Sequence, residues 1–279
     1  MTASLCAVVL AAGEGMRLRP ITEFVPKPLC PVGNVPLLDR ALGRLAVHGI
    51  DGPSSVAVNV FYMAEVVAAH VGGRAHVSRE PGPTALGTAG ALWHLRDWIA
   101  GRGVLALNSD AYLSSLDGKD LVGLLDGWDG RTVRVLTVPA GDRTAEFGDT
   151  RFAGVSLLPG DLVAALPPGK AELVAAVWRP AERAGRLETV PYGGEYFDTG
   201  TPADLLAANL AYLRANSLDA LVSAEAVVSG RIEGSVVGAG AHVAGSVTRS
   251  VVFPGAHVAA GEVLADAIRL GPSVTVTLR

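Results

Sequence analysis

Short apolar runs alternate with amphipathic segments over the first part of the chain. The runs at 5–10, 55–60 and 104–108 are continuous in hydrophobic character, which is typical of strands buried on both faces. Between them, 36–47 and 63–71 carry apolar residues at helical spacing. Strands that alternate with helices in this way form a parallel sheet, so the pattern predicts an α/β fold.

The alternation continues through the middle of the chain. Strands are expected at 133–138, 152–157 and 187–191, and helices at 172–184 and 202–216. A polar stretch joins the first two of these strands. This part of the chain therefore extends the same α/β domain.

From Val222 onward the pattern changes to short apolar steps separated by glycine and alanine. Steps of five or six residues, with one longer gap, are typical of a β-solenoid of about two or three coils. Repeats of this kind also occur in acyltransferases that use a histidine, but His242 and His257 are expected to be exposed residues of the coil face. The recurring apolar positions are Ile232, Val237, Val243, Val252, Val258 and Val263.

Composition narrows the class of protein. The chain has 279 residues, enough for a domain of about 200 residues and a small appendage. It holds 23 Lys and Arg against 27 Asp and Glu, so no basic field favours nucleic acid as a partner. No apolar stretch reaches the roughly 20 residues of a membrane span, and residues 1–4 carry no basic region ahead of the first apolar run, so a soluble, unprocessed protein is expected. The two cysteines, Cys6 and Cys30, make no disulfide framework, which favours a reducing cytoplasm.

The stretch at 10–31 carries the first candidate chemistry. Gly13 and Gly15 follow the first strand and allow a sharp turn whose amide groups could face an anion, while Arg17 and Lys27 add cationic donors for phosphate. The G-x-G-x-x-G spacing of a dinucleotide fold is missing, and so is the G-K-[ST] of a P-loop. A glycine-rich turn with solvent-facing Arg and Lys is the simpler alternative.

The wider pattern L-A-A-G-x-G-x-R-L-R-P-I-T, then P-K-P-L and N-x-P-L-L, resembles the signature of the sugar-1-phosphate nucleotidylyltransferases. The resemblance implies a Rossmann-like three-layer domain with a mixed, mostly parallel sheet at 1–217. It also implies that the repeats at 218–279 form a short left-handed β-helix. Self-association, as a dimer or tetramer, is expected through these repeats because so few coils are marginal alone.

A second segment, E-P-G-P-T-A-L-G-T-A-G-A-L at 80–92, resembles the segment of the same family that contacts the nucleotide. Its simpler interpretation is a helix start capped by Thr88. With the first signature, the resemblance implies that the nucleotide contacts Leu10, Ala11, Ala12, Gly13, Glu14, Gly15, Glu80, Gly87 and Thr88.

Two aspartates stand where the family binds a divalent metal. Asp110 ends the strand at 104–108 and resembles the aspartate of N-G-D, with Ser109 in place of the glycine. Asp198 lies in F-D-T-G-T-P, which resembles W-x-D-x-G-T-P. The resemblance implies Mg²⁺ as cofactor, held by both carboxylates, whereas helix capping is the alternative for Asp110. Thr201 is expected to cap the helix that follows.

The residues expected to bind the sugar phosphate differ from the family pattern. Many relatives carry an E-K-P triplet whose lysine holds the phosphate, and this sequence has none. Arg143 or Arg151 is a possible substitute, with the planar geometry of a guanidinium. Asn59 could face the site at a strand end or simply form a turn, and Gly154 resembles the glycine beneath the sugar.

The resemblance therefore implies an enzyme that joins a nucleoside triphosphate to a sugar 1-phosphate and releases pyrophosphate. Arg17 would stabilise the leaving pyrophosphate, and Lys27 the α-phosphate, with Asp110 as the third catalytic residue. The favoured pair is GTP with mannose 1-phosphate, giving GDP-mannose. Uridylyl or thymidylyl transfer to another sugar 1-phosphate stays open, as does a silent paralogue that binds a nucleotide-sugar and regulates a partner.

Overall fold

The computed structural model describes residues 4–115 and 121–278. The chain divides into two compact units, one of Met1–Glu14 with Leu38–Tyr196 and one of Gly15–Leu37 with Phe197–Arg279. Both units are built from segments that are distant in the sequence. The domain boundary expected at residue 217 stays a prediction.

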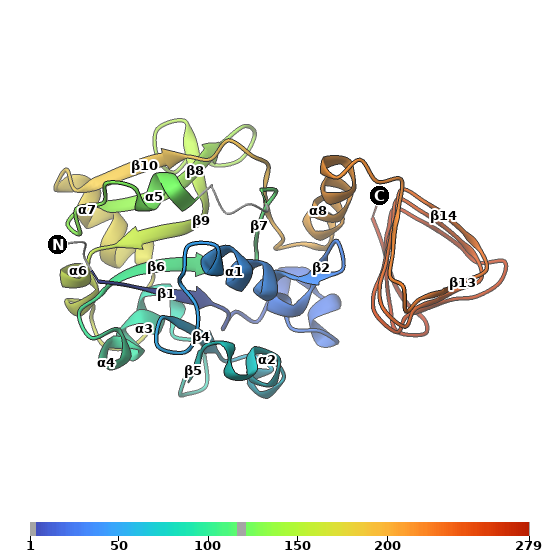
Figure 1. Cartoon of the computed structure of the whole chain (residues 1–279), viewed down its shortest axis with the longest axis horizontal. Coiled ribbons are helices and arrows are strands. Elements are labelled where there is room, and N and C mark those ends of the chain that lie inside the picture. The colour runs from blue at the N-terminus through green and yellow to red at the C-terminus, as the bar shows by residue number, and fades with distance from the viewer. Residues whose placement is uncertain (1–3, 116–120, 279) are drawn as a thin grey trace. The chain divides into compact units, whose positions relative to one another are not determined.

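The first unit is organised around one seven-stranded sheet in the order β10-β8-β9-β6-β1-β4-β5 (Figure 1). Strands β4, β1 and β6 pair in parallel, as do β4 with β5 and β8 with β10, whereas β9 runs antiparallel to both β6 and β8. The expected mixed, mostly parallel sheet is thus confirmed. The strands are β1 Leu5–Leu10, β4 Val56–Val60, β5 His76–Arg79, β6 Gly103–Asn108, β8 Val133–Pro139, β9 Thr150–Leu158 and β10 Leu187–Pro191.

Helices cover both faces of this sheet. One face packs on α3 (Gly87–His94), α4 (Arg96–Ile99), α6 (Gly160–Ala164) and α7 (Arg179–Arg183), where side chains such as Leu92 and Ala181 are buried against the strands. Figure 1 shows α1 and α5 over the opposite face. The remaining helices are α1 Leu37–Ala46, α2 Ala64–Val71 with η4 Gly72–Arg74, and α5 Val122–Leu125.

Two expected helices differ in detail from the prediction. The helix expected from residue 36 begins at Leu37, because Pro36 belongs to the short strand β3 (Val35–Pro36). The helix expected over 172–184 opens as a π-helical segment, η6 (Val174–Trp178), and continues as α7. Sequence periodicity at 3.6 residues does not reveal a π-turn, which is often a local feature of functional sites.

In the second unit, the proline-rich stretch folds into short 3₁₀ turns and a hairpin. The hairpin of β2 and β3 is held by Asn209, which accepts from the Gly33 amide at 2.9 Å and donates to the Pro31 carbonyl at 3.0 Å. Asn209 lies on α8, which Thr201 caps as predicted through the Asp204 amide. The elements are η1 Met16–Leu18, η2 Ile21–Glu23, η3 Lys27–Leu29, β2 Pro31–Val32 and α8 Pro202–Ala215.

The C-terminal repeats form three parallel sheets, and their coils outline a triangle in Figure 1. Val236 pairs with Val251 and Val251 with Ile268, so one coil takes 15 residues and the next takes 17. This arrangement is consistent with the expected β-helix, while its hand stays a prediction. The strands are β12 Leu221–Val222, β13 Val227–Val228, β14 Arg231–Glu233, β15 Val236–Val237, β16 His242–Val243, β17 Ser246–Thr248, β18 Val251–Val252, β19 His257–Val258, β20 Val263–Ala265, β21 Ala267–Leu270 and the antiparallel β22 Val274–Thr277.

One of the recurring apolar positions of the repeats is not buried. Val263 is 72% exposed, and its neighbour Leu264 points inward at 5% exposure and pairs with Val247. The two extra residues of the longer coil shift the alternation at this point, which a regular step could not reveal. Of the other recurring positions, Val237, Val243, Val252 and Val258 are buried, with Ile232 partly buried beside them.

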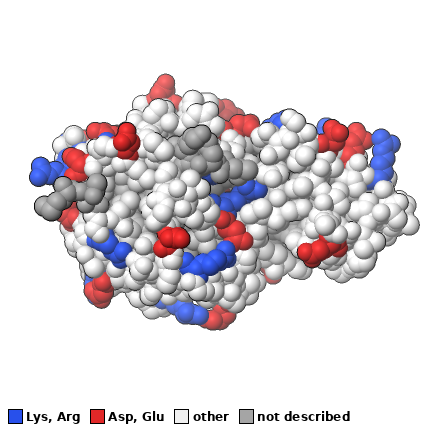
Figure 2. All heavy atoms as spheres, viewed as in Figure 1, with Lys and Arg blue, Asp and Glu red and all other residues white. Residues whose placement is uncertain are grey.

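The surface agrees with the composition. On the face seen in Figure 2, acidic and basic residues are scattered among neutral ones, and the described residues make no continuous basic surface there. Among the described helices, none combines the length and the apolar character that crossing a membrane requires.

Candidate active site

A buried network joins the end of β4 to the residues that follow β1 and β5. The Asn59 side-chain oxygen accepts from the Ala11 amide at 2.8 Å, and its Nδ2 donates to Glu80 Oε1 at 2.6 Å. The other oxygen of Glu80 accepts from the Leu86 amide at 2.7 Å. Both side chains are buried, so the network fixes the signature loop against the second motif. Asn59 is therefore a framework residue here, and its contact with a sugar phosphate stays a prediction.

The turn after the signature loop depends on Gly15. Its φ of +64° lies in the left-handed region, and a Cβ there would approach Thr22 Cγ2 to 2.7 Å. Thr22 in turn donates to the Gly15 carbonyl at 3.0 Å. Gly13 is open, with nothing within 4 Å of the position that a Cβ would take, so its predicted approach to a nucleotide stays a prediction. Sequence reasoning missed Thr22, because its contact is set by the three-dimensional turn.

The cations of the signature meet Asp198 within the second unit. Arg17 NH2 lies 3.4 Å from Asp198 Oδ2, and Lys27 Nζ lies 3.8 Å from Asp198 Oδ1. Lys27 is nearly buried, whereas Arg17 is largely exposed. One carboxylate thus balances both cations that the sequence assigns to phosphate, and the cations stay close together as an anion site requires.

Thr88 does not cap α3 as its simpler interpretation predicted. The N-cap position is Leu86, and Thr88 lies inside the first turn. Its amide and its hydroxyl donate to Glu172 Oε2 at 3.1 and 2.8 Å, and the Leu173 amide donates to its hydroxyl at 2.8 Å. A segment distant in sequence therefore completes the N-terminus of this helix.

The glycines of the second motif are explained by the same segment. Gly87 has φ +75°, and a Cβ there would lie 2.6 Å from the Ala171 carbonyl. A Cβ on Gly90 would lie 2.5 Å from the Gly169 carbonyl. The Ala171 carbonyl accepts from the Gly90 amide, at 3.1 Å. Close backbone packing accounts for both glycines, and the predicted contact of Gly87 and Thr88 with the nucleotide stays a prediction.

Asp110 lies where the sequence places it, directly after β6. The Ser109 amide donates to the Leu10 carbonyl at 3.1 Å, so the ends of β6 and β1 are joined and the half-buried Asp110 follows. The next strand, β7 (Ala111–Leu113), packs against β9 at Gly154, where φ is +81° and a Cβ would lie 2.3 Å from Ala111 Cβ. Gly154 is thus needed for packing beside Asp110, and its place beneath a sugar stays a prediction.

The expected metal involves residues of both units, Asp110 in the first and Asp198 in the second. Within residues 4–115 and 121–278 there is no cluster of three or more His, Cys, Asp or Glu side chains that could hold a metal. Mg²⁺ commonly uses only one or two carboxylates and takes its other ligands from phosphate and water, so the donor chemistry fits. That both carboxylates hold one ion stays a prediction.

The two candidate arginines differ in environment. The Arg151 guanidinium carbon lies 4.8 Å from the centre of the Tyr196 ring, and its Nε is buried without a hydrogen-bond partner among the described residues. Arg143 lies on the exposed connection between β8 and β9. Arg151 thus packs on an aromatic ring, and a contact of either arginine with phosphate stays a prediction.

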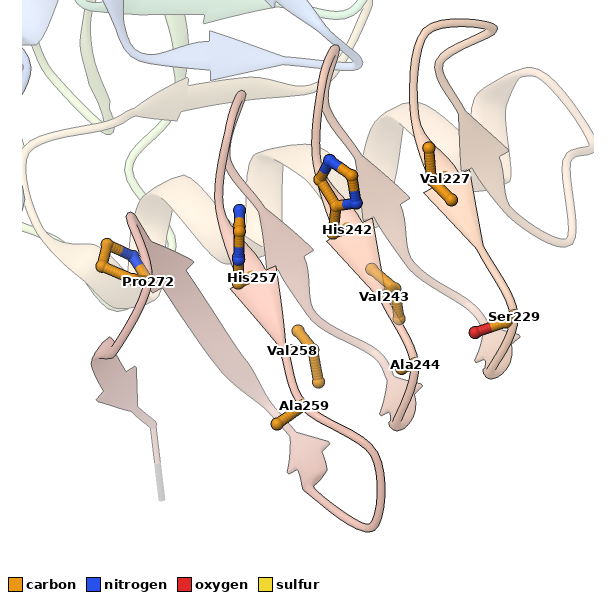
Figure 3. Close-up of a pocket in the computed structure, with 9 residues that line it drawn as sticks. All are labelled: Val227, Ser229, His242, Val243, Ala244, His257, Val258, Ala259 and Pro272. Carbon is orange, nitrogen blue, oxygen red and sulfur yellow. The ribbon is translucent and has the colours of Figure 1, made fainter.

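The histidines of the repeats lie on the outer face of the coils, as predicted. Figure 3 shows His242 and His257 on neighbouring coils, with Val227 on one side of the pair and Pro272 on the other. Their ring centres are 5.0 Å apart, and both residues are exposed. They line a shallow hollow with small apolar residues.

The fold is that of an α/β protein with a glycine-containing turn after its first strand and two cations, Arg17 and Lys27, beside one carboxylate. Residues 6–149 match the model of the nucleotidyl transferase family, and the chain belongs to that family.

Curated relatives support this assignment. The bifunctional protein GlmU of Methanococcus maripaludis is 26% identical over 253 residues, 82% of this chain and 58% of that protein. The N-acetylmuramate alpha-1-phosphate uridylyltransferase of Caulobacter vibrioides is 27% identical over 72% of this chain and 94% of its own. The mannose-1-phosphate guanylyltransferase of Mycobacterium tuberculosis is 35% identical over 127 residues, 43% of this chain and 33% of that protein. The chain thus spans a little over half the length of the GlmU relatives.

A solved structure confirms the fold. A Bacillus anthracis protein described as a glucose-1-phosphate thymidylyltransferase, crystallised with sucrose, matches with a TM-score of 0.62 and 21% identity. The match covers 75% of this chain and 95% of that one. At this identity the likeness concerns the fold alone.

Proposed function

We propose that this protein transfers a nucleoside monophosphate from a nucleoside triphosphate to a sugar 1-phosphate and releases pyrophosphate. The observation that carries the proposal is the pairing of Arg17 and Lys27 with one carboxylate, Asp198, around the turn at Gly15. A triphosphate is the kind of ligand that would replace this carboxylate as the partner of both cations. The relatives named for uridylyl and guanylyl transfer support the same reaction.

The chemistry needs positioning and charge stabilisation more than a nucleophile from the protein. An oxygen of the sugar phosphate attacks the α-phosphorus in line, a new P–O bond forms, and the bond to pyrophosphate breaks. Arg17 would hold the charge that develops on the leaving pyrophosphate, and Lys27 would hold the α-phosphate. Mg²⁺ bound by Asp110 and Asp198 would supply further neutralisation of phosphate charge.

For the substrate pair we propose GTP and mannose 1-phosphate as the first to test. The guanylyltransferase relative is the most similar of the three described above over its aligned length, which supports this choice. Uridylyl or thymidylyl transfer to another sugar 1-phosphate is the alternative, because relatives of those names match more of the chain or share its fold.

A silent paralogue that binds nucleotide-sugar and regulates a partner is a second candidate. The missing E-K-P lysine favours it, whereas Arg17, Lys27, Asp110 and Asp198 are all retained. Pyrophosphate release from five nucleoside triphosphates, each with a panel of sugar 1-phosphates and Mg²⁺, decides between the two. Release from at least one pair supports the enzyme. Binding of nucleotide-sugar without release from any pair would contradict it.

The assembly proposal is separate. We propose that residues 218–279 mediate self-association in the cytoplasm, since so few coils are marginal alone. Light scattering of the full chain should give a dimer or tetramer, and a monomer at all concentrations would contradict it.

A further inference from the structure

The pentapeptide G-A-H-V-A occurs twice in the repeats, at 240–244 and at 255–259. The offset between the two copies is the length of one coil, so the second copy stacks on the first. His242 of β16 pairs with His257 of β19 in parallel register. The fold therefore places two imidazoles side by side on neighbouring strands.

The backbone gives both histidines the same direction. Gly240 and Gly255, which form the corner before each histidine, have φ of +65° and +68°, in the left-handed region. The strands of the two coils are hydrogen-bonded to each other, and the His242 amide donates to the Ala256 carbonyl at 2.9 Å. Figure 3 shows the rings of His242 and His257 on the same side of the sheet.

The separation of the two rings is the one that a shared metal ion needs. Their centres are 5.0 Å apart, and their planes differ by 47°. Two imidazoles that bind one tetrahedral ion, with about 2.0–2.1 Å from each nitrogen to zinc, have their centres about 5 Å apart. Both residues are exposed, so small rotations of the side chains can turn one nitrogen of each ring toward the ion.

The surroundings leave room for an ion with its waters. The hollow beside the rings has a volume of about 400 Å³, and among the described residues that line it there is no Lys, Arg, Asp or Glu. Arg269 donates to the His257 carbonyl at 2.9 Å, but Glu262 balances its charge. No uncompensated cation of the lining therefore opposes a metal ion here.

A purely structural role explains this pair poorly. Val227 occupies the same register position on the preceding coil, and a β-branched residue is the ordinary choice for a strand. Two basic side chains directly opposite each other repel when both are charged, whereas a shared ion makes their contact favourable. Imidazole is a ligand for zinc, nickel and copper, while Mg²⁺ prefers oxygen.

We propose that His242 and His257 bind one divalent transition-metal ion, of the class of Zn²⁺, Ni²⁺ and Cu²⁺, and that this ion links two consecutive coils of the repeats. Among the described residues no cluster of three or more His, Cys, Asp or Glu could hold a metal, so water completes the coordination and the ion exchanges with solution. An ion that binds the folded coils stabilises them by mass action. The site uses neither Asp110 nor Asp198, so it does not depend on the proposed reaction.

Titration of the full chain with zinc chloride, without an affinity tag, tests the site. Calorimetry should find one ion per chain at the tightest site, and an excess of Mg²⁺ should not displace it. His242→Ala and His257→Ala should each weaken binding about a hundredfold, because the second imidazole acts as a tethered ligand. His76→Ala, which removes an exposed histidine of the first unit, is the control and should leave binding unchanged. Binding as tight in both single variants as in the parent would overturn the proposal.

Moving the pair by one coil tests its geometry. Val227 pairs with His242 on one side in the same way as His257 does on the other. Val227→His in the His257→Ala background should therefore restore most of the lost affinity, and the electron paramagnetic resonance of bound Cu²⁺ should show nitrogen ligands. Binding no tighter than that of the His257→Ala chain would contradict an in-register pair as the ligand.

Hydrogen exchange and light scattering test the link between coils. With Zn²⁺, the amides of β16 and β19 should exchange more slowly in the parent and be unaffected in His242→Ala. The mass of the protein in solution should not change when Zn²⁺ is added. Half an ion per chain together with a doubled mass would place the ion between two copies, which would overturn its assignment to neighbouring coils of one chain.

Discussion

Asn59 Nδ2 lies 2.6 Å from Glu80 Oε1, in a buried pair that connects the ends of two neighbouring strands. Asn59→Ala leaves the carboxylate and the Ala11 amide without their partner, which should lower the free energy of unfolding by about 1.5–3 kcal/mol. Urea denaturation measures this loss. Asn216→Ala, at an exposed helix end, is the control and should change stability by less than about 0.5 kcal/mol. Equal losses of unfolding free energy in the two variants would show that the Asn59–Glu80 pair stabilises the fold no more than an ordinary surface contact does.

Asp110→Asn keeps the shape of the side chain and removes its charge. We expect turnover to fall at least about a hundredfold, because a carboxylate that holds a metal cannot be replaced by an amide without losing several kcal/mol of charge stabilisation. The thermal midpoint should stay within a few degrees of the parent. Asp97→Asn, on an exposed helix, is the matched control. Turnover within threefold of the parent would remove Asp110 from the proposed site.

The sequence predicts the sheet well because its strands are buried on both faces and read as continuous apolar runs. β1 and β10 begin and end at the predicted residues. The sequence also predicts that Arg17, Lys27 and Asp198 belong to one site, but only through the family resemblance. No local pattern connects Arg17 with a residue 181 positions further along the chain.

The rest depends on contacts that local sequence does not encode. Glu172 and Ala171 complete the start of α3 across more than 80 residues, so a local pattern makes Thr88 a cap when it is not one. Asn59 could be interpreted as a turn former or a site residue because its true partners, Ala11 and Glu80, are set by strand order. The coil that exposes Val263 takes 17 residues and so departs from the regular spacing of the apolar positions. This departure becomes visible only when the pairing of the stacked coils is known.

Arg151→Ala should raise KM for the sugar 1-phosphate about ten- to a hundredfold, with little change in KM for the triphosphate. Loss of one charge-assisted hydrogen bond to phosphate explains an effect of this size. Arg143→Ala is the comparison, since that residue lies on the exposed connection between β8 and β9 and either arginine could replace the missing lysine. If both variants keep the parent KM for every accepted sugar phosphate, the substitution idea is wrong and another group, such as Lys27 or backbone amides, holds the phosphate.

Both thiols should be inert in the folded chain. Burial raises the pKa of Cys6 to about 11 and that of Cys30 to about 12, from an ordinary 9.0. Iodoacetamide at pH 8 should therefore label neither cysteine until guanidinium is added, and then both. Since the folded-state pKa values are the raised ones, this contribution to stability is complete below about pH 9 and declines as pH rises toward 11 and 12. Rapid labelling of the folded chain at pH 8 would contradict the burial of these residues.

Gly33→Ala should destabilise the second unit more than the backbone conformation alone explains. Gly33 has φ +57°, and an added Cβ would lie 2.5 Å from the Tyr212 ring, so the variant suffers both strain and a clash. Gly49→Ala provides the strain alone, because its φ is +69° and nothing lies within 4 Å of the added carbon. We expect about 1 kcal/mol for Gly49→Ala and about 2–4 kcal/mol for Gly33→Ala, measured by urea denaturation. Shortening the ring to leucine in the Gly33→Ala, Tyr212→Leu double variant should recover part of the extra loss relative to Tyr212→Leu alone. Additive losses in that cycle would mean that the ring is not what the new methyl group meets.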